Sequence, residues 1–349
     1  MNDPAQTLIR TIEKPACYLC GTQGKPLYNN LSDRLFGVPG LWNLKKCPEQ
    51  ECGLIWLDPM PMPEDISKAY VNYFTHGVTY GTLSWQNIRI LFKKIYQYLQ
   101  GAYLAYGFGY LSNSFCQRTI GVLLSALPWS RQRFGRDVAW LTYKHGGRLL
   151  DVGCGNGSFL ANMKRLGWLV EGVEVDPKAV IQARSKGVEV WCQTLQEKRY
   201  PDNFFDAITL FHVIEHVHEP LEMLAECWRI LKKGGLLILT TPNTQSLGRK
   251  IFREYWRGFE PPRHLYLFCR ASLARAVELS GFSNFLITTK ASAFYFWTSK
   301  KIAQNRVTNR SFLYNFYIRL FAYLFELREK MLLTNNPEVG ETLFFKGIK

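Results

Sequence analysis

The sequence predicts an α/β protein with a doubly wound, mostly parallel, seven-stranded sheet. Three observations lead to this fold class. Strand-like apolar runs alternate with helical periodicity over residues 146–290. A glycine-rich turn follows the first of these runs in LLDVGCGNGSFL, residues 149–160. A last strand-like run, ETLFFKGI, stands at residues 341–348. Because parallel strands bring their carboxyl ends to one edge of a sheet, we expect the ligand site at that edge.

The expected elements follow one another closely, and glycines stop several of the helices. Helices are predicted at residues 157–167, 177–186, 219–232 and 270–280. The seven strands are predicted in the segments RLLDVG (148–153), WLVEGVEV (168–175), VEVWC (188–192), FDAITLF (205–211), LLILTT (236–241), FSNFLITT (282–289) and ETLFFKGI (341–348).

The chain divides into three predicted parts. Residues 1–79 are expected to form a loop-rich module held by metal rather than by an apolar core. Residues 80–145 are predicted to be helical, basic and aromatic. Residues 146–349 form the predicted sheet domain, with a helical insertion at about 291–338.

The net charge of +15 is concentrated in two segments. Residues 80–145 carry 8 basic and 1 acidic side chains, and residues 244–349 carry 17 and 7. Such surfaces suit an anionic partner, such as a lipid head group, a phosphorylated carrier or a nucleic acid. We predict that the segments 80–145 and 291–338 pack together and form the acceptor side of the pocket. The side chains that would then face an anionic acceptor or a membrane surface are Lys93, Lys94, Arg131, Arg133, Lys300 and Lys301. The rival interpretation is a set of amphipathic helices with a solvated basic face.

The chain shows neither a membrane-spanning pattern nor a secretion signal. No apolar run reaches the length of about eighteen residues that a spanning helix needs, and the start, MNDPAQTLIR, lacks an apolar core. We therefore expect a cytoplasmic protein, with peripheral contact to the inner face of the membrane as an open alternative.

Four of the nine cysteines form a metal-binding pattern. Cys17 and Cys20 stand in CYLCG, and Cys47 and Cys52 in CPEQECG. In a chain without a secretion signal, this spacing favours zinc over disulfides, and four thiolates would close the shell of a structural ion. The alternative is that these are ordinary reduced thiols. The others are expected to be small core residues: Cys116, Cys154, Cys192, Cys227 and Cys269.

The glycine-rich turn differs from the dinucleotide fingerprint. Its glycines, Gly153, Gly155 and Gly157, have the spacing G-x-G-x-G, and Asp151 stands just before them. A carboxylate there disfavours pyrophosphate and favours a positively charged ligand. Glu174, at the end of the second strand, is placed to accept hydrogen bonds from ribose hydroxyls, as in NAD enzymes. The dehydrogenase interpretation fails because no second nucleotide-binding half follows.

Taken together, four motifs resemble the class I S-adenosylmethionine-dependent methyltransferases. They are LLDVGCGNGSFL, GVEVDP, FDAITLFHVIEHV and LKKGGLLILTTPN, and they cover roughly residues 146–290. CYLCG…CPEQECGLIWLDPMP and WRGFEPPRHLYLF are similar to the subgroup with an N-terminal zinc-binding segment. The resemblance implies a Rossmann-like methyltransferase fold, S-adenosylmethionine as cofactor and a structural zinc ion. Members of this subgroup often belong to bacterial glycan, lipid or secondary-metabolite pathways.

The resemblance also implies roles for single residues. Asp151 and the three glycines of the turn would contact the methionine and ribose part of the cofactor, and Glu174 the ribose hydroxyls. Thr194 and Leu195 match positions that flank adenine, and Phe211 and His212 would face the methyl donor. For each of these residues the alternative is a packing role; Leu195, for example, would fill the core.

Methyl transfer to a hydroxyl needs alignment and a base that takes the proton. The candidate bases are His212, Glu215, His216 and His264. We rank His212 and His264 equally and interpret Glu215 and His216 as structural. Arg263 is placed to meet an anionic group of the substrate.

The sequence therefore predicts an O-methyltransferase that acts on a glycan, a lipid-linked or another small-molecule hydroxyl, free or carried by an anionic carrier. The alternative is an RNA or DNA methyltransferase that binds nucleic acid through the basic segments. Against it, the fourth strand leads into FHVIEHV rather than an N/D-P-P-Y/F motif. A non-catalytic binding module is a third hypothesis, and the intact acidic turn argues against it.

Overall fold

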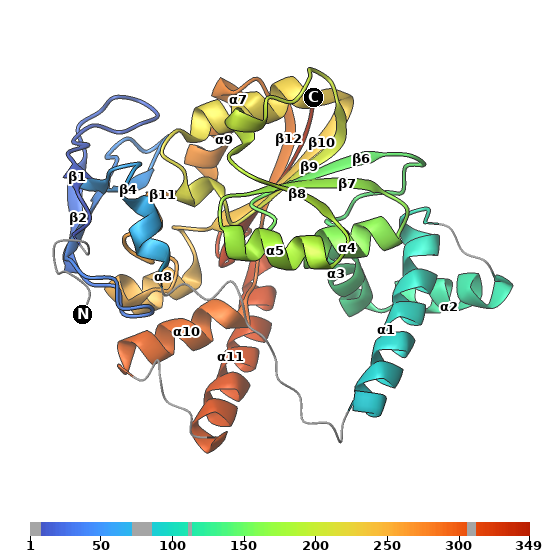
Figure 1. Cartoon of the computed structure of the whole chain (residues 1–349). Helices are drawn as coiled ribbons and strands as arrows, with labels where there is room; N and C mark the ends of the chain where they lie inside the picture. Colours follow the sequence, from blue (N-terminus) through green and yellow to red (C-terminus); the bar gives the residue numbers. More distant parts are fainter. Residues whose placement is uncertain (1–7, 72–85, 111–113, 306–311) are drawn as a thin grey trace. The chain divides into compact units, whose positions relative to one another are not determined.

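The computed structural model describes residues 8–71, 86–110, 114–305 and 312–349, and its main element is a seven-stranded sheet (Figure 1). The strand order is β12-β13-β10-β9-β6-β7-β8. Its strands are β6 (Arg148–Val152), β7 (Leu169–Glu174), β8 (Glu189–Cys192), β9 (Phe205–Phe211), β10 (Leu231–Pro242), β12 (Asn284–Lys290) and β13 (Thr342–Ile348). Each of the seven predicted strand segments overlaps one of these strands, although β10 begins five residues before its predicted segment, and the predicted fold class is confirmed.

The pairing of the strands is mixed, in a sheet that was predicted to be mostly parallel. β6 runs parallel to β7, and β7 runs parallel to β8. β13 lies between β10 and β12 and is antiparallel to both. β9 occupies the centre of the sheet, and all of its residues from Phe205 to Leu210 are buried. An apolar run of this length fits a strand that is covered on both faces.

The helices between the strands begin and end at local signals. Asp176 caps α5 (Pro177–Ser185), since its side chain accepts a hydrogen bond from the Lys178 amide, and Gly187 follows the helix end with a φ of 76°. The other helices of this region are α4 (Ser158–Arg165), α6 (Leu195–Lys198), α7 (Pro220–Ile230), α8 (Leu247–Phe252) and α9 (Arg270–Leu279).

The N-terminal region contains more strand structure than the predicted loop-rich module. Its elements are β1 (Thr11–Ile12), β2 (Lys25–Leu31), β3 (Trp42–Lys46), β4 (Ile55–Leu57), β5 (Met60–Pro61) and the 3-10 helix η2 (Ile66–Tyr70). Its second sheet has the order β11-β4-β3-β2, in which β11 (Tyr266–Leu267) comes from far along the chain. Leu44, Leu54 and Trp56 are almost completely buried. The region therefore has buried apolar side chains, which the prediction of a module held by metal rather than by an apolar core did not include.

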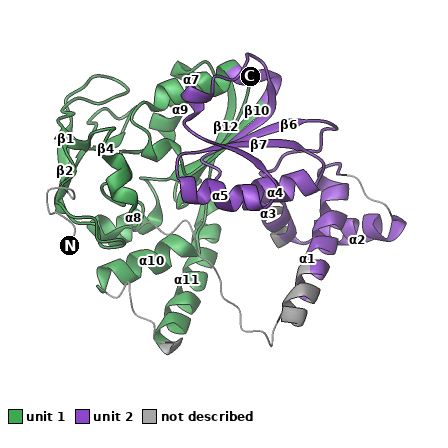
Figure 2. Ribbon diagram, in the orientation of Figure 1, with its two compact units in different colours: residues 1–73, 210–229, 236–349 green, residues 74–209, 230–235 purple. Residues whose placement is uncertain are grey.

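The chain forms two compact units (Figure 2). The first comprises Met1–Tyr73, Leu210–Arg229 and Leu236–Lys349, and the second Phe74–Thr209 and Ile230–Gly235. In the second unit, α1 (Gln86–Gly107), α2 (Phe115–Ser125) and α3 (Pro128–Arg136) contact one another. In the first, α10 (Ala293–Ala303) packs against α11 (Phe312–Leu333) and α8.

Parts of the predicted domain organisation stay predictions. The predicted boundary at residues 79 and 80 lies outside the described residues. The predicted basic segments belong to different units, so their mutual packing also stays a prediction. Among the helices that the structure describes, none combines the length and apolarity that a bilayer crossing requires.

Candidate active site and cysteine cluster

The glycine-rich turn follows β6 and has a backbone that other residues adopt only rarely. Gly153, Gly155 and Gly157 have φ values of 68°, 53° and 69°. A Cβ atom on Gly157 would lie 2.6 Å from the Cβ atom of Ala183, whereas one on Gly155 would meet nothing within 4 Å. Gly157 is therefore required for packing at the start of α4, and Gly155 borders open space.

Asp151 lies on β6 just before this turn, and its side chain is buried. Thr209 of β9 donates a hydrogen bond from its Oγ1 to the Asp151 Oδ1, at 2.6 Å. Burial raises the pKa of Asp151 from its ordinary value of 3.8 to about 7, and the charge of Glu174 adds to this, whereas the Thr209 hydrogen bond opposes it.

Glu174 ends β7 and holds the glycine-rich turn. Its Oε2 accepts a hydrogen bond from the Gly155 amide at 2.8 Å, and its Oε1 accepts one from the Asp176 amide at 3.0 Å. Within the described part of the chain, neither Glu174 nor Asp151 forms an ion pair with a basic side chain. Two acidic groups without a basic partner among the described residues fit a ligand with positive charge and hydroxyl donors, which is what S-adenosylmethionine offers.

Thr194 and Leu195 follow β8 at the same edge of the sheet. Thr194 is the N-cap of α6: its Oγ1 accepts from the Glu197 amide, while its own amide and hydroxyl donate to Glu197 Oε2, both at 2.8 Å. Leu195 is buried. The spacing T-x-x-E is the signal of a capping box that the sequence interpretation passed over. Contact with adenine stays a prediction for both residues.

Phe211 ends β9, and His212 follows with a φ of 57°, which is uncommon for a residue other than glycine. The His212 amide donates to the Thr240 carbonyl at 2.9 Å. Its side chain is 43 % exposed, and its Nδ1 lies 3.1 Å from the Oε1 of Glu215. A rare backbone conformation fixed by neighbours is typical of functional positions.

Glu215 is fully buried in the 3-10 helix η4 (Ile214–His216), and Thr241 Oγ1 donates to its Oε2 at 2.9 Å. Burial alone would raise the pKa of Glu215, but the hydrogen bond and charge of His212 hold it below its ordinary value. The carboxylate thus stays ionised and orients the His212 ring.

His216 and His264 lie next to each other, with ring centroids 4.7 Å apart. His216 Nδ1 lies 2.9 Å from the Tyr70 hydroxyl and 3.1 Å from the Arg263 carbonyl oxygen. His264 Nδ1 lies 2.6 Å from the Gly258 carbonyl oxygen. Burial lowers the pKa of both histidines, so both are neutral at physiological pH. Tyr70 was not identified from the sequence, and no local pattern marks it.

The surroundings of Arg263 contradict the role predicted for it. Its side chain is completely buried, and its guanidinium group pairs with Asp33 at 2.8 Å and with Glu260 at 2.9 Å. Its charge is therefore neutralised within the protein and is not available to an anionic group of a substrate. Arg263 instead links Asp33, in the loop between β2 and β3, to the loop that carries His264.

The predicted anion-facing lysines and arginines have different environments. Lys301 is buried against the ring of Trp297, which contradicts its predicted exposure. Lys300 lies over the rings of Phe296, Tyr317 and Phe321, and Lys94 and Arg133 are exposed. The side chains of Lys93 and Arg131 lie outside the described part of the structure.

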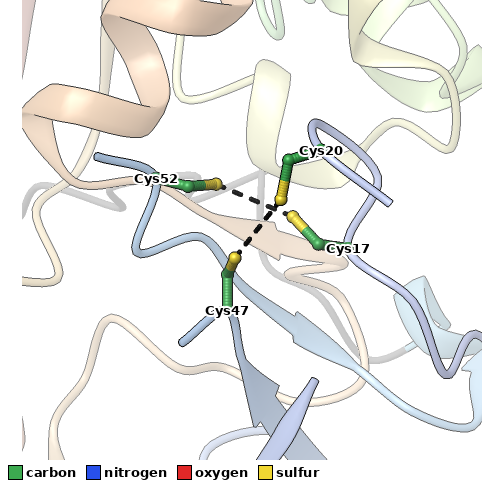
Figure 3. A group of neighbouring side chains, drawn as sticks. All are labelled: Cys17, Cys20, Cys47 and Cys52. Atoms are coloured by element: carbon green, nitrogen blue, oxygen red, sulfur yellow. Dashed lines mark hydrogen bonds between the residues drawn. The ribbon is translucent and has the colours of Figure 1, made fainter. Parts of the chain in front are cut away.

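The four N-terminal cysteines converge from two loops (Figure 3). Cys17 Sγ lies 3.7 Å from Cys52 Sγ, and Cys20 Sγ lies 3.4 Å from Cys47 Sγ. All four sulfur atoms lie within 4.8 Å of one another. A tetrahedral zinc ion with bonds of about 2.3 Å needs sulfur atoms about 3.8 Å apart, so the donor set fits.

Part of this chain matches a known protein family. Residues 131–286 match the family model of a methyltransferase domain. The ubiquinone biosynthesis O-methyltransferase of Caulobacter sp. (strain K31) is 37 % identical over 143 residues, which cover 37 % of this chain and 56 % of that protein. The enzyme of the same name from Xanthomonas oryzae pv. oryzae (strain PXO99A) is 37 % identical over 105 residues, covering 28 % and 44 %.

The chain spans about half the length of these curated relatives. Among solved structures, an S-adenosylmethionine-dependent methyltransferase from Archaeoglobus fulgidus is 20 % identical and aligns with 65 % of this chain and 94 % of its own, with a TM-score of 0.43. Residues 131–286, which match the family model, contain the glycine-rich turn, Glu174 and His212.

Proposed function

We propose that this chain, which carries an S-adenosylmethionine-dependent methyltransferase domain over residues 131–286, is an O-methyltransferase. The observation that carries the proposal is the acidic, glycine-lined turn, in which neither the buried Asp151 nor the half-buried Glu174 pairs with a basic side chain of the residues that the structure describes. S-Adenosylmethionine supplies a methyl group already activated on a sulfonium cation. The two carboxylates suit that positive charge and the ribose hydroxyls, whereas they would repel pyrophosphate.

The acceptor is proposed to be a hydroxyl group of a glycan, a lipid-linked compound or another small molecule. The two relatives described above are named O-methyltransferases, which favours oxygen as the methylated atom. The segment FHVIEHV, which begins at the last residue of β9, fits an O-methyltransferase of small molecules better than a nucleic-acid methyltransferase. It does not contain the motif with which the latter stacks a flipped base.

His212 is proposed as the general base. Its Nδ1 faces the buried Glu215 carboxylate, so the ring Nε2 is left to accept the proton of an attacking hydroxyl. His264 is less suitable because it is buried and because its Nε2 lies 3.7 Å from the Glu260 carboxylate. The exposure of the His212 side chain therefore favours His212 of the two equally ranked histidines.

We also propose a structural zinc ion bound by Cys17, Cys20, Cys47 and Cys52. Burial raises the pKa of the Cys47 thiol to about 11, whereas the hydrogen bond with Cys52 lowers the pKa of the Cys17 thiol to about 5. A divalent ion would balance several thiolates at once. With four protein ligands, it would have no open position for catalysis.

Replacement of Glu174 by alanine is expected to weaken S-adenosylmethionine binding at least ten-fold. The change removes charge-assisted hydrogen bonds to the ligand and the contact that holds the Gly155 amide. Isothermal titration calorimetry measures the effect. The control is Glu189→Ala, an exposed carboxylate at the amino end of β8. Unchanged affinity in Glu174→Ala, or tighter binding of NAD than of S-adenosylmethionine by the wild type, would refute the proposed cofactor.

Replacement of His212 by asparagine is expected to reduce turnover about 100-fold or more, with little change in S-adenosylmethionine affinity, because a general base acts mainly in the transition state. Transfer of a tritiated methyl group to a panel of phenols, sugars and lipid-linked alcohols gives the rate. Glu215→Gln should cause a smaller loss, since it keeps an acceptor for Nδ1. His145→Asn, an exposed loop histidine, is the matched control. Wild-type turnover of His212→Asn would exclude His212 as the base.

A further inference from the structure

Helix α11 lies in a connection that is much longer than its two strands need. β12 and β13 are antiparallel neighbours, which commonly join through turns of two to five residues. Here residues 291–341 separate them and contain α10 and α11. The segment begins after residue 286, where the match to the methyltransferase domain ends. The sheet does not require this insertion, so a separate role is expected for it.

Helix α11 is apolar on two opposite faces. One face is buried and contains Ile318, Ala322 and Phe325, which recur at helical spacing. Figure 1 shows this helix next to α10, against which it packs. The opposite face is also apolar, yet it is exposed: Leu320 is 47 %, Leu324 51 %, Leu327 39 %, Tyr323 56 % and Met331 65 % exposed.

The exposed side chains form one continuous stripe rather than scattered positions. Leu320, Leu324, Leu327 and Met331 follow one another at intervals of three and four residues, so they project from the same side of the helix. Single exposed leucines are ordinary on protein surfaces, but a contiguous apolar face marks an interaction site. We call these four residues and Tyr323 the α11 stripe.

The surroundings of the α11 stripe are positively charged. The described residues 293–305 and 312–333 contain five basic and two acidic side chains. Of the two acidic ones, Glu326 is paired with Lys330 at 2.6 Å, and Glu329 is buried. Arg319 and Arg328 are exposed on the same helix. The net charge next to the stripe is therefore positive, and this decides which partner it fits.

We propose that α11 lies in the plane of an anionic lipid bilayer, with the α11 stripe inserted into the boundary between head groups and acyl chains. A second copy of the chain would bring two positive surfaces together, which disfavours it as the occupant. A bilayer with anionic lipids complements both features, since acyl chains take the leucines and head groups attract the arginines. Tyr323 suits the interface, where its ring and hydroxyl meet different environments.

This proposal does not rest on the methyltransferase activity. It concerns an insertion that lies outside the matched domain. It also differs from the sequence prediction, which rested on the two basic, aromatic segments 80–145 and 291–338 and named only basic side chains, Lys300 and Lys301 among them. Lys301 is buried, and the newly identified contact surface is the apolar stripe.

Flotation of the full-length protein with lipid vesicles tests the proposal. The wild type is expected to float with vesicles of 30 % phosphatidylglycerol in phosphatidylcholine at low salt, and much less with pure phosphatidylcholine. The triple variant Leu320→Gln/Leu324→Gln/Leu327→Gln should bind at least ten-fold more weakly, because glutamine keeps the helix but does not insert. Arg319→Gln/Arg328→Gln should lose about five-fold per arginine on anionic vesicles only.

Leu279→Gln is the matched control, since Leu279 is 58 % exposed on α9 and stands apart from the stripe. It should bind vesicles like the wild type. Circular dichroism and S-adenosylmethionine titration show whether each variant is folded. Equal vesicle binding by the triple variant and the control would overturn the proposal. So would a wild type that ignores both vesicles, or one that forms a dimer in analytical ultracentrifugation which the triple variant abolishes.

Discussion

Replacing Cys47 by serine is expected to remove one zinc ion per chain and to destabilise the N-terminal sheet. Cys47 directly follows β3, and Cys52 stands just before β4, so an ion bound there closes the connection between these strands. Cys17 and Cys20 add the loop between β1 and β2. The ion would tie together two loops, because both pairs of cysteines lie outside the strands.

The size of the effect follows from the binding energy of zinc and the apolar core beside it. Structural zinc contributes on the order of 10 kcal/mol to the folding of zinc-finger peptides. Here Leu44, Leu54 and Trp56 are already buried, so part of the fold should survive without metal. We expect a loss of several kcal/mol, which corresponds to a fall in melting temperature of about 10 °C.

Two measurements check this expectation. Mass spectrometry of the elements gives the zinc content of protein purified without added metal. Near-ultraviolet circular dichroism reports on the packing of Trp42 and Trp56, which are both buried in this region. Cys192→Ser is the control, because Cys192 is an exposed free thiol outside the cluster. A wild type that is free of metal and fully folded, or a Cys47→Ser variant that keeps its zinc, would contradict the site.

The sheet was predictable because its determinants are local. Each buried strand is a short apolar run, and glycines or capping residues mark the turns that follow, as at Asp176 and Gly187. The pairing of β11 with β4 was not predictable in the same way. It joins Tyr266 to Trp56 and Leu267 to Ile55, and no local pattern connects residues so far apart in the chain.

In the candidate site, too, residues that a local motif marks were identified from the sequence, whereas contacts with residues far along the chain were missed. The spacing of the glycines and of Glu174 identified residues that the structure brings together, since Glu174 accepts from the Gly155 amide. Arg263 was misinterpreted because its burial and one of its two acidic partners, Asp33, which lies 230 residues away, leave no local pattern in the sequence. Similarly, sequence alone did not show that Lys301 turns inward against Trp297.

Binding of S-adenosylmethionine is expected to weaken about ten-fold for each pH unit below 7. The cause is Asp151, whose pKa burial raises to about 7 in the free protein. A positively charged ligand favours the ionised carboxylate, so binding must release a proton whenever Asp151 is protonated. Glu174 and Thr209 face this carboxyl group from β7 and β9, and Cys154 lies in the adjoining turn; the Thr209 hydrogen bond favours the ionised form, whereas Glu174 disfavours it.

Through Asp151, a rise in pH strengthens binding of the ligand but lowers the stability of the free protein. A carboxyl group whose pKa is raised by folding costs stability as the pH rises from its unfolded value, near 3.8, through about 7. The free protein should therefore lose stability over this interval through Asp151, and S-adenosylmethionine should restore it. Thermal unfolding with and without the ligand at pH 5.5 and 8 measures the difference.

The variant Asp151→Asn separates this effect from every other titrating group. Asparagine has nearly the same shape, can still accept the Thr209 hydrogen bond and has no charge at any pH. Its affinity for S-adenosylmethionine at pH 8 should fall at least ten-fold, and the dependence on pH below 7 should disappear. Calorimetry in two buffers of different ionisation enthalpy counts the protons released. A pH dependence that persists in Asp151→Asn would assign it to another group, because the Asp151 carboxyl is the only one removed by this change.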